Sequence, residues 1–263
     1  MTLIKDNKII ITGASSGIGE QLAKQIAKHG GIPIMLARNE QRLAKIHQEI
    51  WDDYQIDCEY YVVDLTNLDS YRQALDHLLE NNNQIAALIN NAGVGKFDYV
   101  DEAKNEDNEM MIQLNVLAMI EGVRVMLPHF VSNKWGHIIN IGSQAGKIAT
   151  PKSAVYSATK HAVIGFSNGL RLEVQDKGVF VTTVNIGPVK TNFFSVADPS
   201  GNYQQAVKRF MLDPEDVAIK VVDALFTPKR EINLPKWMDA GSKLYQLFPG
   251  LMERFLKKQF NKK

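Results

Sequence analysis

Short apolar runs rich in β-branched residues alternate with helical patterns along most of the chain, and this alternation restricts the possible folds most strongly. Seven runs predict strands, at residues 8–12, 32–36, 60–63, 85–89, 137–141, 179–184 and 231–234. Several of these runs are apolar throughout, which is typical of strands covered on both faces. Helical spacing of apolar residues is found at 18–27, 105–130 and 155–176. The pattern predicts a parallel sheet with right-handed crossovers.

Length and composition agree with one domain of this α/β class. The chain has 263 residues, of which 45% are hydrophobic and 22% charged, as is usual for a globular protein. Because no repeat, low-complexity tract or linker interrupts the pattern, we expect a single Rossmann-like, doubly wound domain. It has a seven-stranded parallel sheet with helices on both faces. We assign residues 1–242 to this domain and 243–263 to a C-terminal extension.

Charge, cysteine and histidine content exclude several classes of protein. A net charge of +1 gives no electrostatic reason to expect a nucleic-acid partner. The single cysteine, Cys58, cannot form an internal disulfide, which fits a reducing compartment. The six histidines lack the spacing of metal ligands, so no metal is expected. Without a secretory signal or a run of about 18 apolar residues, we expect a cytoplasmic location.

A glycine-rich turn follows the first predicted strand directly and reads T-G-A-S-S-G-I-G. Glycine permits a tight turn and a close approach of the backbone to a pyrophosphate. The helix that follows offers free N–H groups and the positive end of its dipole to the phosphates. The glycine spacing is G-x-x-x-G-x-G rather than the more familiar G-x-G-x-x-G. We predict cofactor contacts from this turn at Gly13, Ser15, Ser16, Gly17, Ile18 and Gly19.

Three further side chains predict acid/base chemistry. Ser143 follows the fifth predicted strand, while Tyr156 and Lys160 are four residues apart and so lie on one face of a helix. The ordinary pKa of tyrosine, about 10, is too high for proton exchange at neutral pH. A neighbouring ammonium group favours the phenolate and lowers that pKa. Ser143 can bind a substrate oxygen and hold it beside the phenol.

With these motifs in this order, residues 8–235 resemble the short-chain dehydrogenase/reductase family, whose cofactor turn has the form T-G-x-x-x-G-x-G. The resemblance implies catalytic roles for Ser143, Tyr156 and Lys160, with Tyr156 as acid or base and Lys160 bound to the nicotinamide ribose. It also implies that Asn115 is a fourth catalytic residue, which holds a water linking Lys160 to solvent. The protein is therefore expected to transfer hydride between a nicotinamide and a carbonyl or alcohol.

The same resemblance implies further contacts with the cofactor. Asp64 and Leu65 follow the third strand, where the family meets the adenine. An N-N-A-G run follows the fourth strand and supports the sheet in the family. The later loop carries the family's glycine, valine and threonine, although Ile186 replaces its proline. The implied contacts in these last two segments are Asn91, Ala92, Gly93, Val189 and Thr191.

The residues after the second strand favour NADP(H) over NAD(H). In this fold the end of that strand reaches the adenosine ribose, where a carboxylate would bind the 2′-hydroxyl of NAD. The chain has no carboxylate there and carries Arg38 instead. A guanidinium group binds phosphate in bidentate fashion, so we predict that Arg38 binds the 2′-phosphate of NADP.

The segment at about 190–212 is apolar and aromatic, which predicts a hydrophobic carbonyl or alcohol substrate. Phe193 and Phe194, together with Ser143, are the predicted substrate contacts. The leading interpretation is a carbonyl reductase or alcohol dehydrogenase that acts on CH–OH donors with NADP as acceptor. Two alternatives remain: a cofactor-sensing binding protein with this fold, and an NAD-linked dehydrogenase or epimerase.

The C-terminal extension is basic and amphipathic. Residues 243–263 carry a net charge of +5, and their apolar residues have helical spacing. Such a segment can lie on an anionic membrane surface, or pack on its own domain or on a second subunit. The family resemblance implies a homodimer or homotetramer formed through the two long helices.

Overall fold

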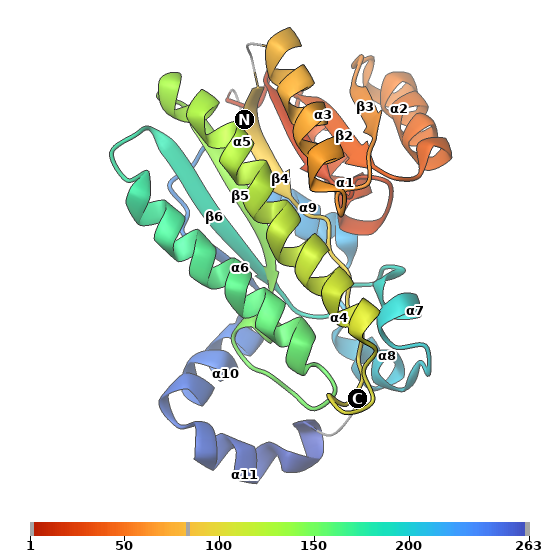
Figure 1. Ribbon diagram of the computed structural model, residues 1–263, viewed down its shortest axis with the longest axis vertical. Helices are drawn as coiled ribbons and strands as arrows, with labels where there is room; N and C mark the ends of the chain where they lie inside the picture. Colours follow the sequence, from red (N-terminus) through yellow and green to blue (C-terminus); the bar gives the residue numbers. More distant parts are fainter. Residues whose placement is uncertain (1–2, 83–84, 261–263) are drawn as a thin grey trace.

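The computed structural model describes residues 3–82 and 85–260, with only the backbone of 256–260. One parallel sheet has the strand order β3-β2-β1-β4-β5-β6-β7 (Figure 1). The strands are β1 (Lys8–Thr12), β2 (Ile32–Ala37), β3 (Glu59–Val62), β4 (Ile85–Asn90), β5 (Gly136–Ser143), β6 (Val179–Ile186) and β7 (Glu231–Leu234). The predicted Rossmann-like fold with seven strands is confirmed. The largest differences are at the carboxyl ends of β5 and β6, which each run two residues beyond the predicted strand.

Helices cover both faces of the sheet (Figure 1). One face carries α1 (Gly17–Lys28), α2 (Glu40–Tyr54) and α9 (Pro214–Val222). The other carries α3 (Leu68–Asn81), α4 (Asn105–Ile112), α5 (Ala118–Ser132) and α6 (Ala154–Glu173). Two short helices, α7 (Phe193–Ala197) and α8 (Asn202–Val207), lie between β6 and α9, and α10 (Lys236–Leu247) and α11 (Pro249–Phe260) end the chain.

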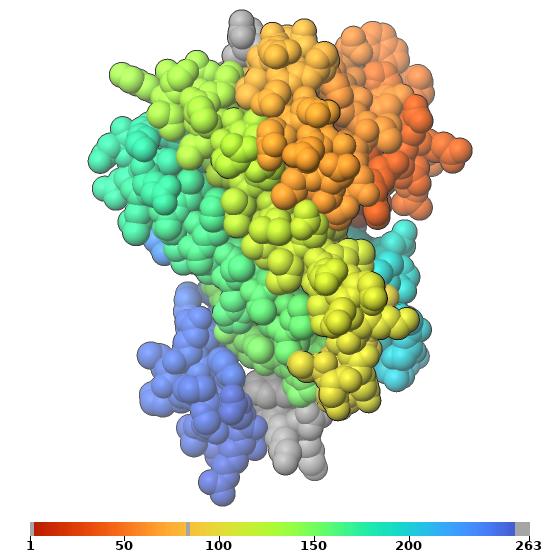
Figure 2. Space-filling model, in the orientation of Figure 1, coloured from red at the N-terminus to blue at the C-terminus, as the bar shows by residue number. Residues whose placement is uncertain are grey.

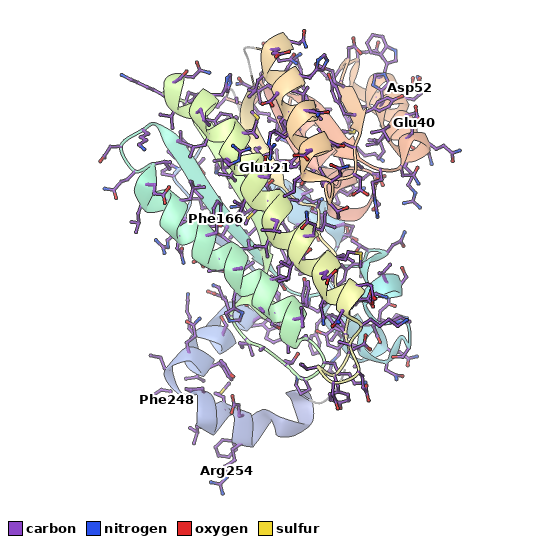
Figure 3. All side chains as sticks on the ribbon, in the orientation of Figure 1. Glu40, Asp52, Glu121, Phe166, Phe248 and Arg254 are labelled. Carbon is purple, nitrogen blue, oxygen red and sulfur yellow. The ribbon has the colours of Figure 1, made fainter. Side chains whose placement is uncertain are left out.

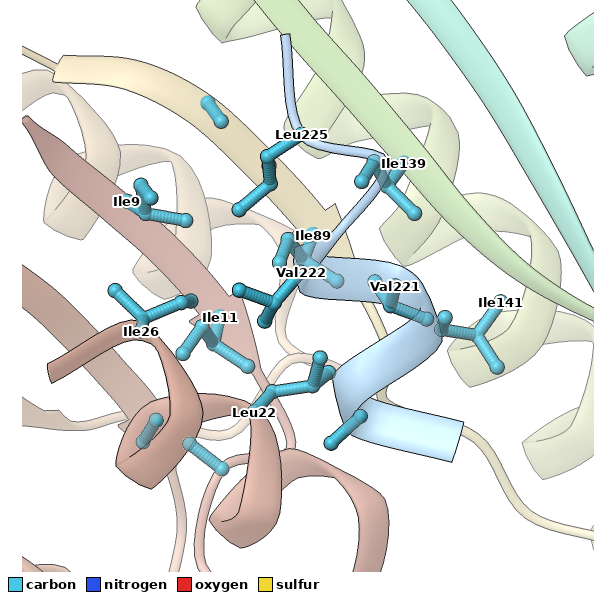
Figure 4. Close-up of a cluster of buried hydrophobic side chains, with 14 of the residues drawn as sticks. Ile9, Ile11, Leu22, Ile26, Ile89, Ile139, Ile141, Val221, Val222 and Leu225 are labelled. Carbon is cyan, nitrogen blue, oxygen red and sulfur yellow. The ribbon is translucent and has the colours of Figure 1, made fainter. Parts of the chain in front are cut away.

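The core consists of two apolar layers, one on each face of the sheet. Figure 4 shows the first layer, where Leu22 of α1 and Val222 of α9 pack on Ile11 of β1. The second layer lies under α3, α5 and α6 and contains Tyr71 and Phe130, both fully buried. Each large apolar side chain buried in this way contributes about 1.5–3 kcal/mol. The two layers fix the sheet, and with it the carboxyl ends of the strands.

The predicted helix at 105–130 is present but is not regular. It consists of α4, a π-helical turn (Gln113–Leu117, labelled η1) and α5. Among the described residues, Asn105–Ser132 is the one stretch long and apolar enough to span a membrane by length and composition. Half of its most apolar window is buried, as in a helix that packs on the core of a globular domain.

The strand order reverses between β1 and β4, which are direct neighbours although β2 and β3 separate them in sequence. Ligands of doubly wound sheets bind beyond the carboxyl ends of the strands at such a switch point. The turn after β1 and the run after β4 meet there. The predicted extension at 243–263 begins inside α10, and Lys262 and Lys263 lie outside the described residues.

Candidate active site

The turn after β1 has a backbone that only glycine adopts without strain. Gly13 and Gly17 have φ values of +67° and +57°, in the left-handed region. A Cβ on Gly19 would lie 2.3 Å from the carbonyl oxygen of Gly13, so a side chain has no room there. Helix α1 begins at Gly17, and the side chain of its N-cap residue, Ser16, makes no capping hydrogen bond. The N-cap side chain therefore does not occupy the first N–H groups of α1. These groups can bind a phosphate that approaches the backbone of the turn closely.

The N-N-A-G run after β4 binds this turn from the side. The hydroxyl of Thr12 accepts hydrogen bonds from the backbone N–H groups of Asn91 and Ala92, at 3.0 and 3.1 Å. In return, Nδ2 of Asn91 donates to the carbonyl oxygens of Thr12 and Gly13, at 2.9 and 3.2 Å. Thr12 and Asn91 thus hold the two segments in one arrangement, which supports the glycine turn.

The loop after β6 closes on the same turn. A Cβ on Gly17 would lie 2.9 Å from Cγ2 of Thr191, which places this threonine beside the start of α1. Val189 pairs with Leu212 in an isolated β-bridge and is buried. Ile186, which replaces the family's proline, is the last residue of β6, aligned with Ser143 in β5 and Leu234 in β7.

Ser143, Tyr156 and Lys160 meet beyond the end of β5. Ser143 is its last residue, while Tyr156 and Lys160 lie one turn apart on α6. The ammonium nitrogen of Lys160 donates to the carbonyl oxygen of Ile141 at 2.9 Å and lies 5.9 Å from the centroid of the Tyr156 ring. The exposed fractions of Tyr156 and Lys160 are only 9% and 5%. The three residues form one buried cluster.

Burial shifts both titratable groups toward their neutral forms. Loss of solvent raises the pKa of Tyr156 to about 12, and this effect outweighs the hydrogen bond from Ser143, which acts to lower it. Burial also lowers the pKa of Lys160 to about 8. The direction for Tyr156 is opposite to that expected from a neighbouring ammonium group alone. The reason is that the low polarity around the phenol disfavours phenolate more than its polar neighbours stabilise it.

Asn115 lies in the π-helical turn and is 2% exposed. Its amide forms two hydrogen bonds of 2.8 Å with the backbone of Val94, one to the N–H and one to the carbonyl. Its nitrogen also donates to the hydroxyl of Thr159 at 3.1 Å. A Cβ on Gly93 would lie 3.2 Å from Oδ1 of Asn115 and 3.5 Å from Nζ of Lys160. Asn115 therefore joins the loop after β4 to α6, close to Lys160.

Arg38 and Asp64 lie at the carboxyl ends of β2 and β3. Both side chains are exposed. Partial burial acts to raise the pKa of Asp64, but the hydrogen bonds from Thr66 and the positive charge of Arg38 outweigh it and lower that pKa. Leu65, the next residue, is buried in the core. The exposed guanidinium of Arg38 at this edge can bind an anionic group.

Aromatic side chains cover Tyr156. The ring centroids of Phe193 and Phe97 lie 5.6 and 5.9 Å from that of Tyr156. Phe97 also contacts Phe194 and Tyr203, with centroids at 6.4 and 5.4 Å. Phe97 was not predicted from the sequence, because it lies outside the aromatic segment at 190–212. The signal that could have found it is its place shortly after the N-N-A-G run, at the same edge of the sheet.

Three comparisons identify the family of the chain. A model of the short chain dehydrogenase family matches residues 7–200. An NADP-dependent 3-hydroxy acid dehydrogenase of Schizosaccharomyces pombe is 35% identical over 231 residues, which are 86% of this chain and 89% of the relative. The structure of a short-chain dehydrogenase from Sphingobium yanoikuyae with NADPH has a TM-score of 0.80 and 25% identity, and covers 93% of this chain and 95% of that chain.

A short chain dehydrogenase/reductase from Burkholderia phymatum in complex with NAD has the same fold over the whole length. It gives a TM-score of 0.87 at 23% identity, with 100% of this chain and 98% of that chain covered. The fold, the family match over most of the sequence and the relative that is 35% identical agree with one another. The chain belongs to the short-chain dehydrogenase family of oxidoreductases.

Proposed function

We propose that this protein is an NADP(H)-dependent reductase of hydrophobic carbonyl compounds, with Tyr156 as the proton donor. The observation that carries the proposal is the buried cluster of Ser143, Tyr156 and Lys160, which lies beside Gly93 and beneath aromatic rings. Retention of all three polar groups favours catalysis over a role in cofactor sensing alone.

The turn fits a dinucleotide because the backbone angles of Gly13 and Gly17 allow a tight turn and the N-cap side chain leaves the first N–H groups of α1 uncapped. The phosphates of the dinucleotide would lie against Gly13, Ser15, Ser16, Gly17, Ile18 and Gly19. Asp64 and Leu65 would meet the adenine, and Asn91, Ala92, Gly93, Val189 and Thr191 would line the remainder. When bound, the nicotinamide supplies the hydride for the carbonyl carbon.

The chain itself supplies position and a proton. Ser143 can donate a hydrogen bond to the substrate oxygen, and the Tyr156 phenol can transfer its proton to that oxygen as negative charge develops there. A pKa of about 12 keeps the phenol protonated at neutral pH, which suits a proton donor better than a base. Lys160 would bind the nicotinamide ribose, and Asn115 would hold the water that links Lys160 to solvent.

Arg38 supports the preference for NADP(H). Its guanidinium is exposed at the end of β2, where it can bind a 2′-phosphate in bidentate fashion. The Schizosaccharomyces pombe relative is named as NADP-dependent, and the Sphingobium structure holds NADPH. The Burkholderia structure holds NAD, so the preference is a property to be measured in this chain.

The aromatic rings around Tyr156 support an apolar substrate. Phe97, Phe193, Phe194 and Tyr203 offer ring faces and edges rather than a cationic group for a carboxylate. We therefore favour aryl or alkyl ketones and aldehydes over 3-hydroxy acids, the substrates in the name of the yeast relative. We also expect a cytoplasmic homodimer or homotetramer.

A screen of ketones, aldehydes, alcohols and 3-hydroxy acids with NADP(H) and NAD(H), followed by nicotinamide absorbance, tests the proposal. We expect the highest kcat/KM for NADPH with a hydrophobic ketone or aldehyde. Tight NADPH binding with no turnover would indicate a cofactor-sensing protein. Preference for NADH would indicate an NAD-linked dehydrogenase, and inversion of a sugar-like substrate without net cofactor consumption would indicate an epimerase.

A further inference from the structure

Helices α10 and α11 form a hairpin that extends from one end of the molecule (Figures 1 and 2). Helix α10 packs on the body: Sδ of Met238 would lie 2.8 Å from a Cβ on Gly187, and the rings of Trp237 and Phe210 are 5.4 Å apart. Helix α11 packs against α10, and the hydroxyl of Tyr245 donates to Glu253 at 2.7 Å. The hairpin is thus a built part of the fold.

A partly buried ion cluster holds the base of the hairpin. Nζ of Lys147 donates at 2.9 Å to each of Glu231 in β7, Asn233 in β7 and Asp239 in α10. The Lys147 side chain is only 9% exposed, and Asp239 is bonded to Lys243 as well. Because these bonds fix α10 to the sheet, the outer side of the hairpin is presented in one orientation.

Five exposed apolar side chains, among those that the structure describes, are called the hairpin surface: Leu244, Leu247, Phe248, Leu251 and Phe255. Their exposed fractions range from 47% to 74%. Trp237 of α10 is exposed as well, but its ring contacts Phe210 at the base of the hairpin. Leu244 and Leu247, three residues apart, share one face of α10, and Leu251 and Phe255, four residues apart, share one face of α11; Phe248 is the residue that follows α10. Figure 3 shows Phe248 at the bend between the helices. Apolar residues so gathered on a surface mark a site of interaction.

The charge around the hairpin surface is positive. Arg254 lies next to Phe255 and points away from the body in Figure 3. Lys257 and Lys258 follow in the sequence of α11. The two acids of the hairpin are engaged: Asp239 binds Lys147 and Lys243, and Glu253 accepts the bond from Tyr245. A partner for this surface must therefore be apolar inside and anionic at its edge.

We propose that the hairpin surface docks on an anionic lipid bilayer. Aromatic and aliphatic side chains can enter the boundary between headgroups and acyl chains, while neighbouring lysine and arginine side chains bind the lipid phosphates. Charge complementarity favours this partner, because residues 243–263 carry +5 and anionic lipids offer a continuous negative surface. The apolar side chains extend over two helices and their bend, as shallow insertion into a flat interface requires.

Co-sedimentation of the full-length protein with vesicles tests this proposal, using phosphatidylcholine alone or mixed with phosphatidylglycerol. We expect binding to the mixed vesicles that weakens as salt increases. The double variant Leu251→Glu/Phe255→Glu should weaken binding by about tenfold or more, because two apolar side chains no longer enter the interface. Its matched control is Trp51→Glu, which changes an exposed apolar residue of α2 that is 43% exposed.

Charge reversal gives a second, independent variant. Arg254→Glu should weaken binding to the mixed vesicles about fivefold or more, the effect of one basic residue near an anionic surface. Lys177→Glu, an exposed lysine after α6, should leave binding unchanged. Equal binding by the wild type and both hairpin variants would overturn the proposal, as would no binding to the mixed vesicles.

Light scattering separates a lipid surface from a second copy of the chain. If the hairpin surface instead joins two copies, the double variant will reduce the molar mass in solution while vesicle binding is absent, and the proposal is then wrong. The vesicle assay contains neither cofactor nor substrate. Its failure would therefore leave the proposed reductase activity untouched, and the absence of that activity would leave vesicle binding to be judged by itself.

Discussion

The methyl group of Thr191 packs against Gly17, although the two residues follow different strands. A Cβ on Gly17 would lie 2.9 Å from Cγ2 of this threonine, and the φ of +57° also favours glycine there. The turn after β1 is thus closed by the loop after β6 on one side and by Asn91 on the other. The shape of the proposed phosphate site depends on three segments that are distant in sequence.

Gly19→Ala should disrupt this turn. The new Cβ would lie 2.3 Å from the carbonyl oxygen of Gly13 and 2.7 Å from Nδ2 of Asn91, so the backbone of the turn must move. We expect NADPH affinity to fall by about tenfold or more, in line with the loss of one or two charge-assisted hydrogen bonds. Titration of protein fluorescence with NADPH measures the change.

The matched control is Gly165→Ala in α6, where an added Cβ meets nothing within 4 Å. Alanine in an unobstructed helical position should raise the free energy of unfolding by about 0.5–1 kcal/mol. NADPH affinity should not change. Equal affinities in the two variants would show that the turn tolerates a side chain.

Arg38→Asp should reverse the cofactor preference. The substitution removes a guanidinium that can bind the 2′-phosphate and adds a carboxylate that repels it. The ratio of kcat/KM for NADPH to that for NADH should fall by about 10- to 100-fold. Lys45→Asp, on the exposed side of α2, is the control and should leave the ratio unchanged. An unaltered ratio in the Arg38 variant would remove this residue from the cofactor site.

Tyr156→Phe should reduce kcat by about 10²- to 10⁴-fold, the usual contribution of a positioned acid or base. The ring and its packing against Phe97 and Phe193 are retained, so the dissociation constant for NADPH should change little. Tyr99→Phe, at a tyrosine that is 48% exposed, should be neutral. Turnover that survives in Tyr156→Phe would refute the assigned proton donor.

The pKa of about 12 for Tyr156 predicts different pH profiles for the two directions of the reaction. Reduction needs the protonated phenol and should vary little through neutral pH. Oxidation needs the phenolate. At pH values below that pKa, the population of phenolate rises about tenfold for each unit by which the pH increases. Its rate should therefore increase steadily from pH 7 toward alkaline values. Profiles of kcat/KM in both directions measure this difference.

The variant Phe193→Ala tests whether burial is the cause of the raised pKa of Tyr156. Removal of a ring 5.6 Å from that of Tyr156 exposes the phenol to water, which should lower the pKa of Tyr156. The alkaline rise in oxidation should then begin at a lower pH than in the wild type. Superimposable profiles would mean that burial does not control the proton of Tyr156.

His137 makes the free energy of unfolding depend on pH in the acidic range. This side chain is fully buried, with its Nδ1 accepting from the N–H of Phe226 at 2.9 Å and its Nε2 2.9 Å from the hydroxyl of Thr182. Burial lowers the pKa of His137 to about 3 from an ordinary value of 6.5. The unfolded chain therefore binds a proton below pH 6.5 that the folded protein does not bind until near pH 3.

The stability contributed by neutral His137 is present above pH 6.5 and is lost as the pH falls toward 3, at about 1.4 kcal/mol per pH unit. Urea unfolding at several pH values measures this slope. His137→Gln should flatten the slope, although it also lowers stability at pH 7.

Most of the architecture could be predicted because it depends on local patterns. Strands buried on both faces read as continuous apolar runs, and β1, for instance, has the predicted bounds Lys8–Thr12 around its three isoleucines. The glycine turn could be located because it needs particular backbone angles at Gly13 and Gly17. The meeting of the glycine turn and the N-N-A-G run then follows from the strand order.

The environment of Tyr156 could not be predicted in the same way. Its pKa depends on how completely Phe97 and Phe193 exclude water, and these residues come from separate loops. A spacing of four residues from Lys160 gives the position of a charge but not the solvation of the phenol. The hairpin of α10 and α11 could not be predicted from the charge pattern either. The basic segment begins at residue 243, whereas α10 begins at Lys236.

The π-helical turn at Gln113–Leu117 has a consequence for Asn115. Its wider hydrogen-bond ring accommodates one residue more than an α-helical turn, so α4 and α5 are out of phase with each other. Deletion of one residue from the π-helical turn would restore a regular helix. It would also rotate α4, on the amino-terminal side, by about 100° around the helix axis. The amide that now grips the backbone of Val94 would then be carried around the axis away from it. The extra residue of the π-helical turn therefore directs the Asn115 side chain toward Val94 and Thr159.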